Sequence, residues 1–251
     1  MISVTELTSY VNGLLEVSDF KDYCPNGLQV QGRPQIEHLV AGVTASQALI
    51  EAAIDANADA ILVHHGYFWH GEDPCITGIK YQRIKRLLEA GVSLLAYHLP
   101  LDAHPVFGNN AQLALKLGLI VDGRFGEAKQ PIAMHGHLAS SQSVEDFCGH
   151  IASVLNRSPL YIGEAARKIN TVAWCTGAAQ SYINQAVELG VDAFITGEVS
   201  EQTVHIAREA GIVFIAAGHH ATERYGAQAL GTHLAENFAL SQQFIDIENP
   251  V

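Results

Sequence analysis

The sequence predicts an α/β fold made of two similar domains with mainly parallel sheets. Short apolar runs alternate with stretches of helical spacing, which is the pattern of consecutive strand–helix–strand units. Two segments of the chain that lie 133 positions apart also align without gaps. In addition, polar side chains follow the apolar runs, most clearly His64 and His65 after residues 60–63. A continuous apolar run of this kind is typical of a strand buried on both faces.

The composition describes a globular protein with a large buried core. Apolar residues make up 48% of the 251 residues and charged residues only 16%. The 14 basic and 26 acidic residues give a net charge of −12. An acidic surface repels phosphate backbones and anionic lipids, so we expect neither nucleic acid nor a membrane as partner. The four cysteines form no Cys-x-x-Cys pair and no apolar run reaches membrane length, which predicts a cytoplasmic protein.

The first half of the chain predicts alternating helices and strands. Apolar spacing indicates a helix over residues 3–16, and residues 25–27 indicate a turn before a short strand. Thr44 or Ser46 can cap the helix that follows the second strand. The predicted strands are 28–30, 38–43, 60–63 and 92–96, and the further helices are 47–56, 79–90 and one from Asn109 or Asn110 to Leu117.

The second half begins after a predicted linker. This stretch, residues 122–129, is rich in glycine and charge. We therefore expect residues 1–125 with 217–251 to form the first domain and residues 126–216 the second. The predicted strands of the second half are 131–138, 171–175, 213–217 and 244–247, and its helices are 143–155 and one that ends near Phe238.

The second half repeats the pattern of the first. Residues 41–66 align with residues 174–199, which places Asp59 on Asp192. A Glu-Ala-Gly triplet recurs at an offset of 120 positions. Any two strand–helix–strand units share part of this pattern, but the ungapped agreement favours a duplicated unit. Each half then presents polar groups at equivalent strand ends.

Three polar clusters each follow an apolar strand. Their side chains are imidazoles and carboxylates, which are ligands for Zn, Mn, Fe, Co or Ni. If the strands are parallel neighbours, the clusters open at the sheet edge where ligands bind in α/β proteins. His219 and Glu223 are four positions apart, so a helix would place both on one face. The clusters are His64 with His65, His98 to His104 with Asp102, and His219 with His220 and Glu223.

Each of these residues also has an ordinary structural interpretation when it is taken alone. Neighbouring residues of a regular strand point to opposite faces, so His64 and His65 can address one ion only if the strand ends there. Otherwise the two histidines could serve two different ions, or they could be half buried and hydrogen-bonded without binding any ion. Asp102 alone could cap a helix or a turn. A carboxylate can bridge two ions ~3.5–4 Å apart, as in two-metal hydrolases. Three clusters at one topological edge favour a metal site.

Five motifs carry a family resemblance. In chain order they are Gly42-Val-Thr-Ala-Ser, Val63-His-His-Gly, His98-Leu-Pro-Leu-Asp, Ile195-Thr-Gly-Glu and Gly218-His-His-Ala-Thr-Glu. Together they resemble the YbgI-type members of the Nif-three-like family, also called GTP cyclohydrolase 1 type 2 homologues. The resemblance implies the Nif-three-like fold, a toroidal homohexamer and two divalent metal ions between the halves of each subunit. It places the metal ligands at His64, His65, Asp102, His219 and Glu223.

These observations lead us to expect a dinuclear metal-dependent hydrolase that acts on a nucleotide or a purine-like heterocycle. The family's name implies opening of the GTP ring at a cyclic amidine C–N bond, with a metal-activated water attacking the purine and formate leaving. We expect Glu198 or His98 to carry protons, and Tyr67, Phe68 or Trp69 to stack on the base. Two alternatives stay open: a two-metal phosphoesterase, and a non-catalytic, ring-shaped metal-binding scaffold.

Overall fold

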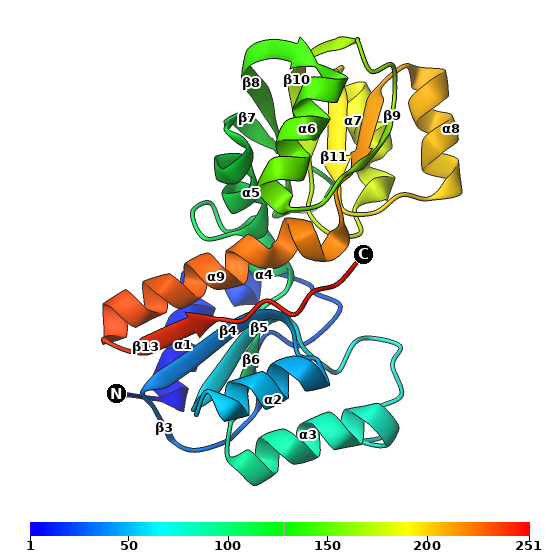
Figure 1. The fold of residues 1–251 in the computed structure, drawn as a ribbon. Coiled ribbons are helices and arrows are strands. Elements are labelled where there is room, and N and C mark those ends of the chain that lie inside the picture. The colour runs from blue at the N-terminus through cyan, green and yellow to red at the C-terminus, as the bar shows by residue number, and fades with distance from the viewer. Residues whose placement is uncertain (128) are drawn as a thin grey trace. The chain divides into compact units, whose positions relative to one another are not determined.

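The strands of the chain are gathered in sheets that belong to two structural units (Figure 1). The computed structural model describes residues 1–127 and 129–251. Unit 1 comprises Met1–Gly108 and Gly226–Glu248, and unit 2 comprises Asn109–Tyr225 and Asn249–Val251. Helix α9 (His219–Phe238) therefore begins in unit 2 and ends in unit 1.

Unit 1 is built on a mostly parallel sheet. Its elements are β1 (Ile2–Ser3), α1 (Val4–Leu14), η1 (Val17–Asp19), β2 (Gly27–Val30), β3 (Gln35–Ile36), β4 (His38–Thr44), α2 (Gln47–Asp55), β5 (Ala60–His65), α3 (Gly78–Ala90), β6 (Ser93–Ala96), α4 (Leu99–Ala103), the later part of α9, and β13 (Ser241–Phe244). The strand order is β13-β4-β5-β6-β2, with only β2 antiparallel to its neighbour. β1 and β3 form a separate antiparallel pair. The expected parallel α/β sheet is thus confirmed for this unit.

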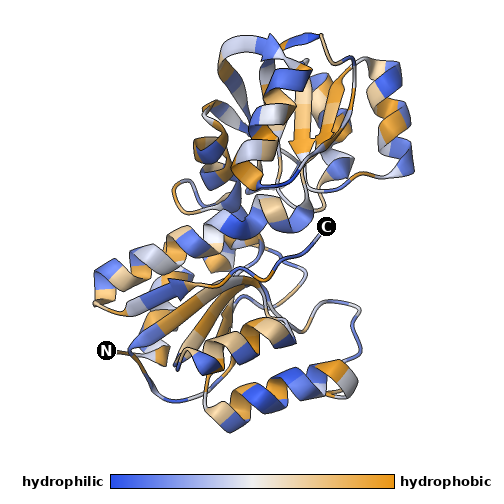
Figure 2. Ribbon diagram, viewed as in Figure 1, coloured by the Kyte–Doolittle hydropathy of each residue, from blue (hydrophilic) through white to orange (hydrophobic). Residues whose placement is uncertain are grey.

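Two apolar cores cover the faces of this sheet. Leu49 of α2 packs in the core around Ile61, which α3 also covers. Leu7 of α1 and Leu230 of α9 pack in the core around Leu62. Consecutive residues of β5 therefore enter opposite cores, as a strand buried on both faces must. Figure 2 shows apolar strands beneath helices with hydrophilic outer faces, and no helix in the described part of the chain is long and apolar enough to cross a bilayer.

Unit 2 has a mixed sheet with a parallel centre. Its elements are α5 (Asn109–Leu117), β7 (Leu119–Phe125), β8 (Ala133–Ser143), α6 (Val144–Leu155), β9 (Leu160–Ile162), β10 (Lys168–Trp174), η2 (Gln180–Tyr182), α7 (Ile183–Glu188), β11 (Ala193–Thr196), α8 (Glu201–Ala210), β12 (Val213–Ala216) and the first turns of α9. The strand order is β7-β8-β10-β11-β12-β9, and β10, β11 and β12 run parallel. Phe147 of α6 packs on one face with Trp174. Ile183 of α7 packs on the other with Phe194.

The strand registers repeat between the units. Leu39 pairs with Ala60 in unit 1, and Val172 pairs with Ala193 in unit 2, each 133 positions further along. The next strand of each unit is related by the offset of 120 positions. Ala60 pairs with Ser93 in unit 1 and Ala193 pairs with Val213 in unit 2, and Val213 lies 120 positions after Ser93. The alignment found in the sequence is therefore also an alignment of hydrogen-bonded strands, which supports a duplicated strand–helix–strand–helix–strand unit.

The repeat extends to a half-buried carboxylate at the start of each central strand. Asp59 accepts hydrogen bonds from the backbone N–H groups of Glu37 and His38, at 2.8 and 2.9 Å. In unit 2, Asp192 accepts from the backbone N–H groups of Asn170 and Thr171, both at 2.9 Å. In each unit the carboxylate satisfies N–H donors of the neighbouring strand, so it stabilises the strand pair from the side chain.

One predicted linker is a strand. Residues 122–125 belong to β7, which pairs antiparallel with β8 and has a register shift between Val121 and Gly123. A Cβ on Gly123 would lie 2.6 Å from Nε2 of His135, so the glycine permits this pairing. The linker prediction is therefore wrong there, because β8 supplies the partner that the local composition does not reveal. Residue 128 of that linker lies outside the described residues.

The unit boundaries differ from the predicted ones. Residues 109–125 belong to unit 2, not to the first domain, because β7 pairs with β8 and Leu113 of α5 packs in the same core as Phe147. Residues 217–225 also belong to unit 2, because Ala221 packs in that core. Contacts between residues distant in the chain decide both boundaries. The last strand is likewise displaced from its prediction, because β13 is an edge strand in which three polar residues precede Phe244 and which pairs with β4 through its backbone.

We expect Asp59→Ala to lower the free energy of unfolding by about 2–3 kcal/mol, because two backbone N–H groups lose a charged acceptor. Burial raises the pKa of the Asp59 carboxyl. The N–H groups of Glu37 and His38 and the Arg33 guanidinium lower this pKa by more than burial raises it, so it lies below its usual value. The stabilisation is therefore present above the unfolded-state pKa and is lost as the pH falls through the lower folded-state value.

Urea unfolding at pH 7 and at pH 3–4 measures both effects, and Asp55→Ala is the matched control, since Asp55 ends α2 and is exposed. We expect the control to change stability by less than about 0.5 kcal/mol. Equal effects of the two substitutions at pH 7 would contradict the role assigned to Asp59.

Candidate metal centre

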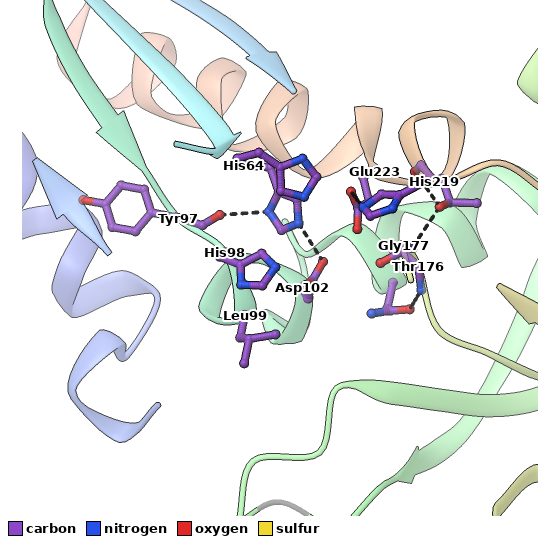
Figure 3. A network of polar contacts seen from close by, with 12 residues as sticks. His64, Tyr97, His98, Leu99, Asp102, Thr176, Gly177, His219 and Glu223 are labelled. Carbon is purple, nitrogen blue, oxygen red and sulfur yellow. Dashed lines mark hydrogen bonds and ion pairs between the residues drawn. The ribbon is translucent and has the colours of Figure 1, made fainter. Parts of the chain in front are cut away.

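His64 is held at the carboxyl end of β5 with one ring nitrogen fixed. Its side chain is fully buried, and its Nδ1 lies 2.9 Å from the backbone carbonyl of Tyr97, directly after β6 (Figure 3). A carbonyl only accepts hydrogen bonds, so Nδ1 carries the proton and Nε2 is the ring nitrogen that can bind an ion. The parallel pairing of β5 with β6 places this carbonyl beside the ring.

His65 is the last residue of β5. Its Nδ1 lies 3.1 Å from the hydroxyl of Thr44, the last residue of β4. The rings of His64 and His65 have their centroids 4.5 Å apart and are tilted by 47°. Because the strand ends at this point, the two imidazoles lie on one side of the sheet edge instead of on opposite faces. This meets the condition under which neighbouring histidines can address a common region.

Asp102 presents a buried carboxylate to His64. It lies on α4, which starts with Pro100 in its first turn, a favoured position for proline. Its side chain is 7% exposed, and its Oδ1 lies 3.5 Å from Nε2 of His64. Two ligands of a tetrahedral ion at about 2.1 Å are separated by roughly 3.4 Å. The observed distance therefore suits two atoms that share one ion.

His98 is fixed by a network around Asp22. Its Nδ1 lies 2.7 Å from Oδ1 of Asp22, and its backbone N–H donates to the Asn26 amide oxygen at 2.7 Å. The other carboxylate oxygen of Asp22 accepts from the Asn26 side chain and from the backbone N–H of Leu99. Burial raises the pKa of Asp22, but the hydrogen bond and charge of His98 and the hydrogen bonds from the Asn26 side chain and the Tyr23 backbone N–H outweigh burial and lower it. Asp22 is thus a carboxylate that orients His98.

The histidines of unit 1 come close enough to share a metal ion. One ring nitrogen from each of His64, His65 and His98 lies within 4.8 Å of the others. The possible ligand atoms of Asp22, Cys24 and His98 likewise lie within 4.8 Å of one another. However, burial and the nearby Asp22 charge raise the pKa of the Cys24 thiol to about 12, so it stays protonated and is a poor ligand. The three-histidine group is the better candidate.

Unit 2 contributes a histidine flanked by two carboxylates. His219 opens α9, and its Nδ1 lies 2.7 Å from Oε1 of Glu198. Its Nε2 lies 3.1 Å from Oε2 of Glu223, one helical turn further on. Burial alone would lower the pKa of His219, but the hydrogen bonds and charges of Glu223 and Glu198 outweigh it and raise the pKa to about 9. Glu198 therefore orients the imidazole of His219, one of the predicted metal ligands.

Gly177 makes the close packing around Glu223 possible. Its φ is +70°, and a Cβ at this position would lie 2.1 Å from Oε1 of Glu223. Its backbone N–H donates to the hydroxyl of Thr222, which in turn donates to the carbonyl of His219 (Figure 3). The loop after β10 therefore touches the first turn of α9 with no room for a side chain. Gly177 was not among the residues predicted from the sequence.

The three aromatic residues of the loop that follows His64 and His65 differ in burial and in their contacts. Tyr67 is buried and donates its hydroxyl to the Ala45 carbonyl, and burial raises its pKa, so it is part of the core. Gln29 holds this loop by accepting from the Tyr67 N–H and donating to the Tyr67 carbonyl. Trp69 is half-buried, with its ring edge-on to His98 at 4.9 Å between centroids. Phe68 and Trp69 thus stay candidates for stacking, and Tyr67 does not.

Two histidines of the predicted clusters have structural contacts. Nδ1 of His104 accepts from the N–H groups of Val106 and Phe107, and its ring stacks on Phe107. The backbone N–H of His220 donates to the carbonyl of Val251. The structure thus brings together His64, His65, His98 and Asp102 in unit 1, and His219, Glu223 and Glu198 in unit 2.

Three supporting residues were missed from sequence, namely Asp22, Asn26 and Gly177. Asp22 and Asn26 flank the predicted turn, where aspartate and asparagine are ordinary turn residues. Their link to His98 spans more than 70 positions of the chain. A Thr-Gly pair directly after a strand was the only local signal for Gly177. These signals are too common to be specific.

Comparison with known proteins gives a consistent picture. The model of the family Duf34/NIF3 (NGG1p interacting factor 3) matches residues 2–250. A curated Pseudomonas aeruginosa protein named GTP cyclohydrolase 1 type 2 homolog is 55% identical over 250 residues, covering 99% of each chain. A Vibrio cholerae protein of the same name is 53% identical over 248 residues, covering 98% of each. The solved structure of protein ybgI, described as of unknown function, has a TM-score of 0.96 at 50% identity, and TTHA1606 from Thermus thermophilus has 0.88 at 31%, both over 100% of both chains.

We expect Gly177→Ala to weaken metal binding at His219 and Glu223, because the new Cβ would displace the Glu223 carboxylate. Gly190→Ala is the matched control, since Gly190 has the same φ of +70° and no atom within 4 Å of a new Cβ. Both substitutions carry a left-handed backbone cost of about 1 kcal/mol. Isothermal titration with Zn²⁺ should show at least about tenfold weaker binding for Gly177→Ala alone. Equal affinities would contradict the steric argument.

In the metal-free protein we expect His219 to titrate near pH 9 in an NMR pH series. Glu198→Gln should lower this pKa by roughly one unit or more, because one charged acceptor is lost. The folded-state pKa is raised above the unfolded value of ~6.5, so the stabilisation is complete below pH 6.5 and is lost as the pH rises through 9.

A metal ion that binds His219 must displace this proton. The affinity for the ion should therefore increase by up to about tenfold for each unit by which the pH is raised, until the pH reaches 9. His219→Gln identifies the resonance, and His205→Gln, at an exposed position of α8, is the control. A midpoint near 6.5 for wild-type His219 would contradict the flanking-carboxylate argument.

Proposed function

The chain belongs to the Duf34/NIF3 family, and from this premise we propose that it is a dinuclear metal-dependent hydrolase acting on a nucleotide or a purine-like heterocycle. The proposed ligands are His64, His65, Asp102, His219 and Glu223, and the proposed ions are two divalent ions among Zn, Fe, Mn, Co and Ni. The curated relatives that carry the name GTP cyclohydrolase 1 type 2 homolog support GTP as the first substrate to test. The toroidal homohexamer that the resemblance implies is part of the same proposal.

One observation carries the proposal. Each proposed ligand histidine has its Nδ1 engaged by an oxygen of its own unit: the Tyr97 carbonyl, the Thr44 hydroxyl or the Glu198 carboxylate. Histidines that bind metals almost always donate their other ring N–H in this way, which orients the ring and leaves one nitrogen for the ion. The residues therefore fit divalent transition ions that prefer imidazole and carboxylate ligands.

The chemistry then divides between the ions and the chain. Bound divalent ions would supply an activated water and stabilise developing negative charge. In unit 1, His98 presents its Nε2 while Asp22 holds Nδ1, an arrangement that suits proton transfer at Nε2. In unit 2, Glu198 already binds Nδ1 of His219, so its first role is to orient that ligand. His98 is therefore the better supported of the two proton-carrier candidates.

The protein residues near His65 suit a flat heterocycle. Trp69 lies 6.0 Å from His65 between ring centroids and 4.9 Å from His98. An aromatic side chain beside the proposed ligands can stack on a purine, and such stacking tolerates different bases. The net charge of −12 opposes a triphosphate, so the ions would also have to neutralise the substrate. These considerations favour a nucleotide or a related heterocycle over a nucleic acid.

We expect metal-loaded protein to release formate from GTP and to yield a product that fluoresces after conversion to a pterin. His64→Ala should lower the rate by at least about 100-fold, because an imidazole ligand is lost. His205→Ala is the control, since His205 is exposed on α8 and should leave the rate unchanged. Formate assay and fluorescence with Zn²⁺, Fe²⁺, Mn²⁺, Co²⁺ and Ni²⁺ measure the result.

Two outcomes would overturn the heterocycle assignment. Release of phosphate with the base intact would make the protein a two-metal phosphoesterase. Stoichiometric metal binding without turnover of any nucleotide in a panel would support a metal-binding scaffold instead. Absence of metal binding would remove the hydrolase proposal altogether.

A further inference from the structure

Arg83 of α3 carries a half-buried guanidinium that has no part in the proposed metal centre. We propose that this guanidinium, beside the aromatic loop of residues 66–77, binds a phosphate group and forms the phosphate subsite for the nucleotide substrate. The assignment of the phosphate to a nucleotide rests on the proposed function, whereas phosphate binding itself can be measured without turnover.

Three cations form a stripe along α3. Lys80, Arg83 and Arg86 are spaced three residues apart, so they lie on one side of the helix in successive turns. All three side chains are half-buried, whereas Ile84 and Leu87 pack in the core. The stripe therefore follows the edge of the buried face, where an arginine can bury its stem and present its charged end.

The cations on either side of Arg83 are bound to carboxylates. Lys80 Nζ lies 3.1 Å from Oε1 of Glu72, which belongs to the aromatic loop. Arg86 donates from Nε and Nη2 to the two carboxylate oxygens of Glu51 of α2, at 2.9 and 2.7 Å. α2 and α3 cover the same face of the unit 1 sheet (Figure 1). Arg83 thus lies between two ion pairs, one with the loop and one with α2.

Arg83 differs from both of these neighbours. Its Nε is buried without a hydrogen-bond partner among the described residues, and no carboxylate among them forms an ion pair with it. A buried donor without an acceptor is costly, and more so on a charged group. A guanidinium presents its N–H donors in a planar fork that matches the oxygens of a phosphate. The side chain is therefore suited to an anion that the chain does not supply.

Arg83 also lies near the proposed site of the heterocycle. Burial raises the pKa of the Tyr67 hydroxyl and the charge of Arg83 lowers it, so the guanidinium is within electrostatic reach of this side chain. Glu72 links the loop to the stripe, because it accepts from the Trp69 N–H at 3.2 Å and pairs with Lys80. Arg83 is about 4.5 Å further along the helix axis than Lys80. A nucleotide whose base stacks on Trp69 would thus extend its phosphates along α3 to Arg83.

A local positive charge is needed because the chain as a whole is acidic. Its net charge of −12 repels the phosphates of a nucleotide. Lys80 and Arg86 are already paired with carboxylates, so Arg83 is the cation of the stripe whose charge is available to a ligand. Arginine binds phosphate through charge-assisted hydrogen bonds that are frequently bidentate, and these are stronger than hydrogen bonds between neutral groups.

Ligand titrations of the full-length, metal-free protein test the inference, because no metal ion then binds the phosphate. Guanosine, GMP, GTP and inorganic phosphate are titrated by calorimetry. Wild type should bind GMP at least about tenfold more tightly than guanosine, and Arg83→Gln should remove this preference, as expected for loss of hydrogen bonds to a charged group. Arg83→Lys should keep part of the preference, because the charge remains and the fork is lost.

Lys85→Gln is the matched control and should leave the preference for GMP unchanged. Lys85 is an exposed cation of the same helix and lies 3.6 Å from Glu89, so its loss changes the net charge equally. Circular dichroism and urea unfolding show whether each variant is folded. Quenching of Trp69 fluorescence, identified by its loss in Trp69→Phe, reports stacking of the base.

The ligand panel also identifies the source of the phosphate. GMP binding that is tighter than binding of inorganic phosphate, with both dependent on Arg83, supports a nucleotide subsite. Equal affinities for GMP and inorganic phosphate, again dependent on Arg83, support the phosphate site and contradict its assignment to a nucleotide.

Three results would overturn the inference and leave the proposed function intact. The first is the same preference for GMP in wild type and Arg83→Gln, and the second is no preference in wild type. The third is an equal loss in Arg83→Gln and Lys85→Gln, because only the net charge would then matter. Conversely, phosphate binding that depends on Arg83, without turnover of any nucleotide by metal-loaded protein, would support the phosphate site and contradict the proposed function.

Discussion

The hydrogen bond between Nδ1 of a histidine and an oxygen on a neighbouring segment is the interaction on which the candidate centre depends. A histidine can present either nitrogen and can rotate, so two histidines in sequence do not make a metal site. The Tyr97 carbonyl removes that freedom for His64, and the Glu198 carboxylate removes it for His219. In both cases the acceptor is available only because parallel strands end side by side. The sheet therefore orients the candidate metal-binding histidines through the oxygens at its carboxyl edge.

The repeated strand registers explain why donors occur at equivalent positions of both units. Asp59 and Asp192 hold the start of each strand pair by the same hydrogen bonds, so the opposite ends of the strands also correspond. The units differ in what they place there. Unit 1 carries three imidazoles and Asp102, whereas unit 2 carries one imidazole between two carboxylates. A duplicated scaffold thus carries two different sets of candidate metal ligands.

Close packing at glycine is the second constraint at the site. A side chain at Gly177 would occupy the position of the Glu223 carboxylate, and one at Gly66 would lie 2.2 Å from the Gln29 amide oxygen that holds the aromatic loop. The chemistry of the proposed ligands therefore depends on residues that contribute no functional group. Such residues act by allowing backbone to approach, and their substitution changes the site through packing and not through charge.

The sequence by itself determined the α/β class, the 133-position repeat and the polar clusters after His64, His98 and His219, because apolar periodicity and strand-end positions are local patterns. Tertiary structure alone decided that residues 122–125 are a strand, that Asp22 belongs to His98, and that Tyr67 is a core residue. Each of these depends on a partner in another segment of the chain: the next strand β8, the segment after β6, or the Ala45 carbonyl. Local sequence records the propensity of a segment, whereas the choice of its hydrogen-bond partners is made only when distant segments pack together.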